Sequence, residues 1–306
     1  MSARPQPSTT EDSPRGLAFA VSAYLLWGFL PLYMKQLSAI PALEVLAHRV
    51  IWSVPVAALV LIALGRTRDI ATAIRTPRML GMALVTAALV SVNWGIYVWA
   101  IGAGRALDAA LGYYINPLFS VFLGAVILGE RLGLAQKLAI ALAAMAVALL
   151  TWEAGSLPWV ALALTFSWGF YAYFRKTLPI GPNQGFLLEV LLLTPPALAY
   201  MAWLAARSEG HFLAGIGLDT ALLLGCGIVT AVPLMLYANG AKLLRLSTIG
   251  MMQYIAPTMI FVLAVFVFDE PFSGTKLVAF ALIWAALAIF TGSMLARARR
   301  ARPRAG

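Results

Sequence analysis

Ten long apolar runs follow one another along this chain of 306 residues, with only short linkers between them. A helix needs about 20 apolar residues to cross the hydrocarbon core of a bilayer. Strands of a β-barrel are shorter and alternate apolar with polar residues, and these runs do not alternate. We therefore expect an all-α integral membrane protein of ten transmembrane helices. The expected spans are residues 16–37, 42–64, 79–101, 107–128, 133–152, 157–176, 184–205, 220–241, 247–268 and 275–295.

The composition supports a membrane protein without a cofactor. Apolar residues make up 62% of the chain and charged residues 11%, whereas soluble domains have about 45–50% and roughly 25%. One cysteine, Cys226, excludes a disulfide within the chain, and only two histidines are present, which argues against zinc, haem and iron–sulfur sites. No phosphate-binding glycine loop and no nucleophile–histidine–acid arrangement is recognisable. We therefore expect no metal, no cofactor and no enzymatic activity.

The positions of the basic residues predict the orientation of the spans. If both termini are cytoplasmic, 17 of the 22 Lys and Arg residues lie on the cytoplasmic side, as the positive-inside rule requires. The net charge of +10 then reflects membrane topology, and we expect no nucleic-acid partner. The other five basic residues are Lys35, Arg49, Arg105, Arg207 and Lys276.

Both ends of the chain are polar. Residues 1–15 are rich in Ser, Thr and Pro, and we predict a disordered N-terminal tail. The apolar run that follows is too long for a signal-peptide core, so it is interpreted as a retained first helix. Residues 296–306 contain five arginines and are predicted to form a cytoplasmic tail that contacts anionic lipid of the inner leaflet.

The two halves of the chain, residues 16–152 and 157–295, resemble each other. Because each half has five spans, an odd number, the second half enters the membrane from the opposite side. Such inverted repeats are typical of secondary transporters with a substrate site near the midplane, and rocking of the halves would open that site to each side in turn. The matches are Trp27-Gly28-Phe29 with Trp168-Gly169-Phe170, Lys35 with Lys176, Glu44 with Glu189, YYINP (113–117) with QYIAP (253–257), and Glu130 with Glu270.

Several motifs resemble a known family. The segments AYLLWGFLPLYMK, EVLAHRVIWS, LGYYINP, LGER, SLPWVALALTFSWGFY and RLSTIGMMQYIAPT are similar to the RarD branch of the EamA-like drug/metabolite transporter superfamily. The resemblance covers residues 16–295. It implies a permease of the bacterial inner membrane that exports or exchanges a small organic metabolite, amino acid or drug. Members of the branch are named for chloramphenicol sensitivity.

Two prolines, Pro117 and Pro257, lie near the middle of their spans. A proline inside a helix removes one backbone hydrogen bond and bends the helix, which here frees the carbonyls of Tyr113 and Gln253. In lipid such carbonyls need a partner or a wet cavity. We interpret both prolines as helix kinks, either beside a cavity or in a packed interface.

Aromatic and amide side chains at a similar depth are candidates for the wall of this cavity. Trp27 and Trp168 lie too deep for an interfacial belt, and they form either packed contacts or a shared aromatic wall. The glycines that follow them, Gly28 and Gly169, would permit close helix approach. The expected cavity residues are Trp27, Asn93, Tyr97, Tyr113, Tyr114, Asn116, Trp168, Tyr171, Gln253 and Tyr254.

Charged residues within the spans are functional candidates. Lys35 with Glu44, and Lys176 with Glu189, are predicted as two related ion pairs, unless the lysines snorkel and the glutamates only stabilise helix N-termini. Arg49 has no counterpart in the second half. It either binds a carboxylate or acts as a gate, with His48 changing charge near neutral pH, or Glu44, His48 and Arg49 form a structural network.

Glu130 and Glu270 at the membrane edges are interpreted as structural. The sequence thus predicts a secondary transporter with a small-molecule substrate, as a monomer or a homodimer. The alternatives are a lipid or lipid-linked sugar flippase, and a sensor or scaffold without flux. Because no carboxylate lies at the midplane, proton antiport and exchange both stay open.

Overall fold

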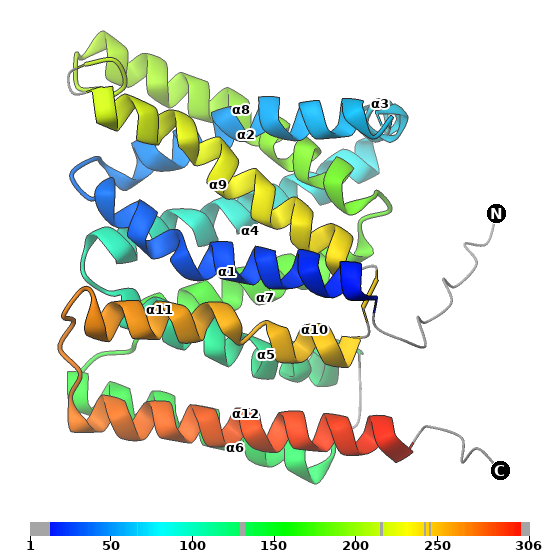
Figure 1. The fold of residues 1–306 in the computed structure, drawn as a ribbon, viewed down its shortest axis with the longest axis vertical. Coiled ribbons are helices and arrows are strands. Elements are labelled where there is room, and N and C mark those ends of the chain that lie inside the picture. The colour runs from blue at the N-terminus through cyan, green and yellow to red at the C-terminus, as the bar shows by residue number, and fades with distance from the viewer. Residues whose placement is uncertain are drawn as a thin grey trace.

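The computed structural model describes residues 13–65, 67–128, 132–214, 217–241, 243–244 and 246–300, and every regular element among these residues is a helix. The long helices lie side by side in one stack, with the start of α1 and the end of α12 at the same end of it (Figure 1). The helices are α1 (Pro14–Gln36), α2 (Ala42–Ala63), α3 (Arg68–Arg75), α4 (Pro77–Gly102), α5 (Ala106–Leu128), α6 (Leu134–Ala154), α7 (Trp159–Thr177), α8 (Pro182–Ala206), α9 (Gly217–Ala241), α10 (Leu246–Met252), α11 (Ile255–Phe266) and α12 (Gly274–Arg300).

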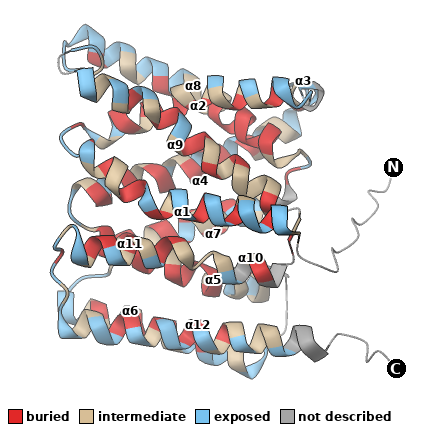
Figure 2. Ribbon diagram, viewed as in Figure 1, coloured by how far each residue is buried: buried red, intermediate tan, exposed pale blue. Residues whose placement is uncertain are grey.

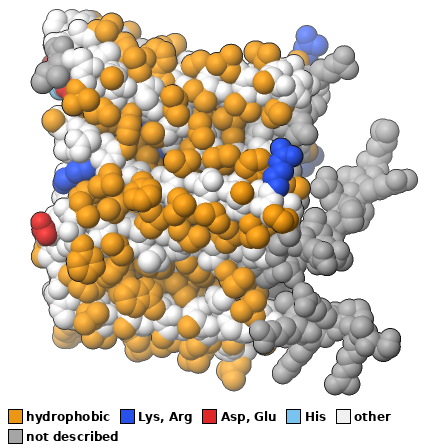
Figure 3. All heavy atoms as spheres, in the orientation of Figure 1, with side chains coloured by type: hydrophobic (Ala, Val, Ile, Leu, Met, Phe, Trp, Pro, Cys, Tyr) orange, Lys and Arg blue, Asp and Glu red, His pale blue; other side chains and the backbone are white. Residues whose placement is uncertain are grey.

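Eight of these helices are long and apolar enough to cross a membrane, namely α1, α2, α4, α5, α6, α8, α9 and α12. Large apolar side chains point outward on them, including Ile62 (66% exposed) and Val126 (64%). Exposed residues follow α8 at one edge of the stack and α6 and α12 at the other (Figure 2). On the face drawn in Figure 3, hydrophobic side chains cover the middle, and the Lys, Arg and acidic side chains lie at the two ends of the helices. The protein is therefore an all-α membrane protein, as expected.

Two expected spans have a different form. The expected span 157–176 corresponds to α7, whose four tyrosine and tryptophan side chains and terminal Arg175 and Lys176 lower its mean hydropathy. The expected span 247–268 is divided into α10, with seven residues, and α11, with twelve. The short helix α3 in the linker before α4 was not expected. The expected disordered tail lies outside the described residues up to residue 12, and α1 already begins at Pro14.

The two kink prolines do not behave alike. Pro117 lies inside the continuous helix α5. Pro257 is the third residue of α11, and a proline in the first turn of a helix removes no hydrogen bond because its N–H would have no partner there. The expectation of a single bent helix at Pro257 is therefore wrong, since the helix ends at Met252 and resumes at Ile255. The break places Gln253 and Tyr254 between two helix ends.

The helices of the two halves are interleaved. α6 packs on α12, α2 on α8, and α5 on α11. The remaining extensive contacts come in corresponding pairs: α1 with α9 and α7 with α4, α1 with α11 and α7 with α5, and α2 with α9 and α8 with α4. All of these contacts join a helix of the first half to a helix of the second half. The halves are therefore not two separate bodies, and one half cannot rock as a unit against the other.

Glycines allow the interleaved helices to approach closely. A Cβ atom at Gly112 of α5 would lie 2.7 Å from the backbone oxygen of Ala161 in α7. A Cβ atom at Gly28 would collide with Met259, and one at Gly169 would collide with Phe119. The expectation of close helix approach at Gly28 and Gly169 is confirmed.

We predict that Gly112→Ala lowers the free energy of unfolding by about 1–3 kcal/mol, because overpacking against a fixed backbone forces helices apart. The measurement is the thermal unfolding midpoint of the purified protein in detergent. Gly81→Ala is the matched control, since a Cβ atom there meets nothing within 4 Å, and alanine is the better helix former. An unchanged midpoint for Gly112→Ala would contradict the close approach of α5 and α7.

Candidate functional site: a central aromatic cavity

A cavity lies within the helix stack, lined by α1, α2, α4, α5, α7, α9 and α11 and by Gln253 in the break between α10 and α11. Its volume is about 130 Å³, whereas a single water molecule needs only roughly 10–15 Å³ on the same measure. The space therefore suits a small organic molecule or several waters. Seven of the ten expected cavity residues line it: Trp27, Asn93, Tyr97, Tyr113, Asn116, Trp168 and Gln253.

The two repeat-related tryptophans meet in this cavity. The rings of Trp27 and Trp168 contact edge to face, with centroids 6.5 Å apart and planes at 83°. Tyr237 continues the aromatic surface from Trp27 at 5.5 Å, and Tyr113 continues it from Trp168 at 6.5 Å. Edge-to-face pairs are favourable because the positive edge of one ring meets the negative face of the other. The result is a continuous aromatic wall built from both halves of the chain.

Asn93 and Asn116 have different roles in the wall. The Asn93 amide nitrogen donates to the Leu164 carbonyl at 3.1 Å and to the Ser167 hydroxyl at 3.0 Å, while its oxygen accepts from the Tyr113 hydroxyl at 3.2 Å. Asn93 thus positions Tyr113 and joins α4 to α7. In contrast, the Asn116 side-chain oxygen is buried and has no hydrogen-bond partner among the described residues.

Three expected cavity residues lie elsewhere. The Tyr114 hydroxyl shares a hydrogen bond of 2.7 Å with Thr258, and the Tyr171 hydroxyl donates to Glu189 at 3.3 Å. Tyr254 packs among apolar residues at the helix break. These three residues were expected in the cavity because they are polar and deep, but depth does not determine which face of a helix points inward.

The sequence reasoning did not include several lining residues, among them Tyr24, Trp94, Thr230 and Tyr237. Tyr24 precedes Trp27 by three positions, so both lie on one face of α1. Thr230 and Tyr237 are seven positions apart on α9 and likewise share a face. This helical spacing was a usable signal for Tyr24, whereas α9 carries no motif that pointed to its inward face.

Arg49 enters the cavity rather than joining a charge network. Its side chain is only 3% exposed, its Nε donates to the Thr230 hydroxyl at 3.0 Å, and its guanidinium lies 4.9 Å from the centroid of the Trp94 ring. Its Nη1 is buried without a hydrogen-bond partner in the described part of the chain. His48, the next residue toward the N-terminus, instead accepts from Trp52 at 2.9 Å. Neighbouring helix positions diverge by about 100°, so the two side chains point to different faces.

Glu44 has a different partner from those predicted. It is fully buried, and its two oxygens contact the backbone N–H of His211 at 2.7 Å and the His211 ring nitrogen Nδ1 at 2.8 Å. Lys35 lies instead over the Phe268 ring, 5.5 Å from its centroid. The expected Lys35–Glu44 ion pair is therefore wrong. Of the two alternatives for Arg49, the described contacts favour the cavity over a network with Glu44 and His48. The segment between α8 and α9 folds over the start of α2 and supplies the partner.

Glu189 is also buried, and it pairs with Arg175. The Arg175 Nε lies 3.3 Å from the Glu189 carboxylate. The expected partner was Lys176, whose side chain lies outside the described residues. Because Arg175 precedes Lys176 by one position, the sequence placed a basic residue near Glu189 but missed the helix face that meets α8.

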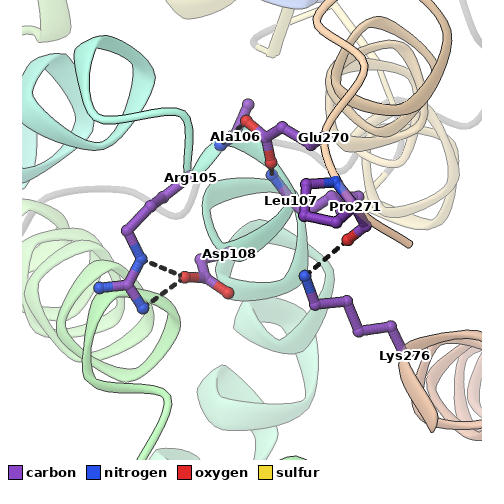
Figure 4. Close-up of polar contacts among 7 residues, drawn as sticks. All are labelled: Arg105, Ala106, Leu107, Asp108, Glu270, Pro271 and Lys276. Atoms are coloured by element: carbon purple, nitrogen blue, oxygen red, sulfur yellow. Dashed lines mark hydrogen bonds and ion pairs between the residues drawn. The ribbon is translucent and has the colours of Figure 1, made fainter. Parts of the chain in front are cut away.

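Glu270 connects the two halves at the end of the stack where α5 begins. Its carboxylate accepts from the backbone N–H groups of Ala106 at 2.6 Å and Leu107 at 2.9 Å (Figure 4). These N–H groups belong to the first turn of α5, where helical N–H groups lack internal partners and favour a negative charge. Glu270 was interpreted as structural, and it caps a helix of the other half. Glu130, its expected counterpart, lies outside the described residues.

The comparisons with known proteins identify the family of the chain. The sequence model of the EamA-like transporter family matches residues 14–152. Protein RarD of Escherichia coli K12 is 40% identical over 290 residues, covering 95% of this chain and 98% of that protein. The chain belongs to the EamA-like transporter family. Within that family it is a RarD-type protein, as its motifs indicated.

Other relatives agree with this assignment. An uncharacterized transporter of Vibrio cholerae serotype O1 is 45% identical over 296 residues, covering 95% of this chain and 98% of the relative. The chloramphenicol-sensitive protein RarD of Pseudomonas aeruginosa is 32% identical over 306 residues, covering 96% and 99%. A crystal structure at 23% identity superposes with a TM-score of 0.59 over 96% of this chain and 100% of that chain, which shows a shared fold. The RarD-type protein is therefore a multi-pass transporter of the bacterial inner membrane and not an enzyme.

We predict that Glu270→Gln lowers the free energy of unfolding by about 0.5–2 kcal/mol, the usual cost of losing a helix N-cap. The amide keeps one acceptor but loses the charge and the second acceptor at the start of α5. The thermal unfolding midpoint is the measurement. Glu209→Gln is the control, because the Glu209 carboxylate is 49% exposed and pairs only with the exposed Arg207. Equal midpoints for the two variants would refute the capping role.

Proposed function

We propose that this RarD-type protein is a secondary transporter that moves a small organic molecule across the inner membrane through the central cavity. The observation that carries the proposal is the contact of Trp27 with Trp168, repeat-related residues that line one cavity. A site shared by two inverted halves can open to either side with similar energy. Export or exchange is the expected direction, by resemblance to the family.

The proposed topology is ten spans as a 5+5 inverted repeat, with both termini in the cytoplasm. In this arrangement α7 is one span and α10 with α11 is another, so each half has five. The contacts between helices support the repeat because they occur in corresponding pairs. The match of the family model to residues 14–152 agrees with a first repeat of about that length. The start of α1 and the end of α12 lie at the same end of the stack, which suits an even number of crossings.

Because the halves are interleaved, we propose that alternating access involves two mixed bundles. One bundle contains α1, α9 and α11, and the other contains their counterparts α7, α4 and α5, in accordance with the packing pairs. The cavity lies between them, with Trp27 on one bundle and Trp168 on the other. The cross-half contact of Glu270 with α5 would then have to separate when the site opens at that end.

A lipid or lipid-linked flippase is the second candidate, and one observation favours it. A groove between α1 and α9 is lined by apolar and aromatic side chains, and Leu30 lines both this groove and the central cavity. An acyl chain would fit such a surface. A fluorescent phospholipid scrambling assay in proteoliposomes tests this candidate, and a rate equal to that of empty liposomes would exclude it.

The predictions about lipid contact and oligomeric state are also proposals. The arginine-rich residues 296–306 would contact anionic lipid of the inner leaflet. The side chains of residues 297–300 and all of residues 301–306 lie outside the described part of the chain. The monomer and the homodimer both remain predictions. A sensor or scaffold without flux is disfavoured because it would have no use for a cavity shared by inverted repeats.

The transporter proposal is tested by uptake and efflux in proteoliposomes. The panel contains amino acids, organic acids and phenicol drugs, each measured with and without a pH gradient. We expect flux of at least one member above that of protein-free liposomes. A stimulation by the gradient would indicate proton antiport, whereas flux that requires an internal substrate would indicate exchange. No flux of any member would contradict the proposal as stated.

We predict that Trp27→Ala and Trp168→Ala each reduce flux of the transported member at least about tenfold, since removing a stacking ring costs more than 1.4 kcal/mol of binding. Trp152→Ala is the matched control, because Trp152 is 89% exposed and outside the cavity. All three variants must reach wild-type expression. Wild-type flux in both cavity variants would place the transport path elsewhere.

A further inference from the structure

The Arg49 guanidinium is a buried charge without a counter-ion. It lies at 3% exposure in α2, with one hydrogen bond to Thr230 and a contact with the Trp94 ring. Neither partner carries a negative charge, and Nη1 has no hydrogen-bond partner among residues that the structure describes. A buried charge is costly unless it is paired and hydrogen-bonded. Arg49 is therefore an unpaired positive charge in the cavity that a bound anion would neutralise.

The three buried carboxylates among the described residues are already engaged. Glu44 binds His211, Glu189 binds Arg175, and Glu270 binds the backbone of α5. No acidic residue is among the residues that line the cavity in the described part of the chain. The negative partner of Arg49 must therefore come from outside the protein.

We propose that the cavity binds an organic carboxylate, with its carboxylate group on Arg49 and its apolar part against Trp27 and Trp168. This inference rests on the proposed function and names the substrate class of the same site. Arginine presents donors in a planar fork that matches a carboxylate, and such charge-assisted hydrogen bonds are among the strong ones. The aromatic wall alone would also hold a cation, but Arg49 repels a cation in the same cavity.

Two further unpaired atoms define the rest of the ligand. The Tyr97 hydroxyl lines the cavity and has no hydrogen-bond partner among the described residues, so it can donate to the same carboxylate. The Asn116 side-chain oxygen also lines the cavity and lacks a partner there, and it can accept from an N–H or O–H group. The preferred ligand is therefore an organic acid that also carries a hydrogen-bond donor.

The charge is present in only one half of the repeat. The position of the second half that corresponds to Arg49 is Thr194, whose hydroxyl donates to the Val190 carbonyl in its own helix at 2.7 Å. A pseudosymmetric cavity with one cation binds an asymmetric ligand in one orientation. The carboxylate end of the ligand therefore lies toward α2 and α9.

The experiment compares ligands that differ only in charge. The purified full-length protein in lipid nanodiscs is titrated with 3-phenylpropanoate, 3-phenylpropanamide and 3-phenylpropylammonium, and with phenylalanine and phenylalaninamide. Binding is followed by isothermal calorimetry and by quenching of tryptophan fluorescence. We expect each carboxylate to bind at least about tenfold more tightly than its amide, because the amide leaves the charge of Arg49 unpaired, and the ammonium compound to bind most weakly.

Variants assign the preference to Arg49. Arg49→Gln is expected to bring the carboxylate and its amide within about twofold, whereas Arg49→Lys keeps part of the preference because it keeps the charge. Arg207→Gln is the matched control and should bind as the wild type does, since Arg207 is 55% exposed and pairs with Glu209. If Arg49→Gln does not fold, the charge series on the wild-type protein still decides the question.

Tighter binding of the amides or the ammonium compound, or no binding of either carboxylate, would overturn the inference. These outcomes differ from failure of the proposed function. Flux of a neutral or cationic compound that depends on Trp27 and Trp168 would leave the transporter proposal intact and reject the carboxylate site. Carboxylate binding through Arg49 without flux of any compound would support the site and reject the transporter.

Discussion

Polar groups within the apolar belt of this protein need partners inside the protein, because lipid offers none. The buried side chains largely follow this constraint. Glu44 binds His211, Glu189 binds Arg175 and Tyr171, and Asn93 uses both ends of its amide. The bonds of Glu44 and Asn93 join the two halves of the chain, and those of Glu189 join α8 to α7. They hold the stack together where apolar packing against lipid gives little preference for one arrangement.

Seven buried polar side-chain atoms have no hydrogen-bond partner among the described residues, and three of them surround one space. Arg49 Nη1, the Tyr97 hydroxyl and the Asn116 oxygen are unpaired among the described residues, and all three residues line the central cavity. Because these three atoms surround one space bounded by aromatic rings, a single polar ligand can bind all of them. This is why the cavity, rather than the charged ends of the helices, is the candidate site.

The repeat and its departures from symmetry have separate consequences. In the proposed mechanism, the contact of Trp27 with Trp168 and the corresponding helix contacts would allow the same site to be reached from either side. The asymmetric elements, Arg49 without a basic counterpart and a helix broken near Pro257 but continuous at Pro117, give the cavity two different ends. In this proposal, symmetry would serve access and asymmetry would serve recognition.

The sequence by itself determined the membrane class, the helical fold, the family and the depth of most cavity residues, because apolar length, repeat matches and motif spacing are local properties of the chain. It also identified Glu44 and Glu189 as intramembrane carboxylates. Only the tertiary structure decided their partners. His211 meets Glu44 because the loop between α8 and α9 lies over the start of α2, and Arg175 meets Glu189 because its face of α7 lies against α8. The same holds for Arg49, whose closeness in the sequence to Glu44 and His48 suggested a local network. Its place in the cavity follows from the packing of α2 against α9, which no local pattern in the chain records.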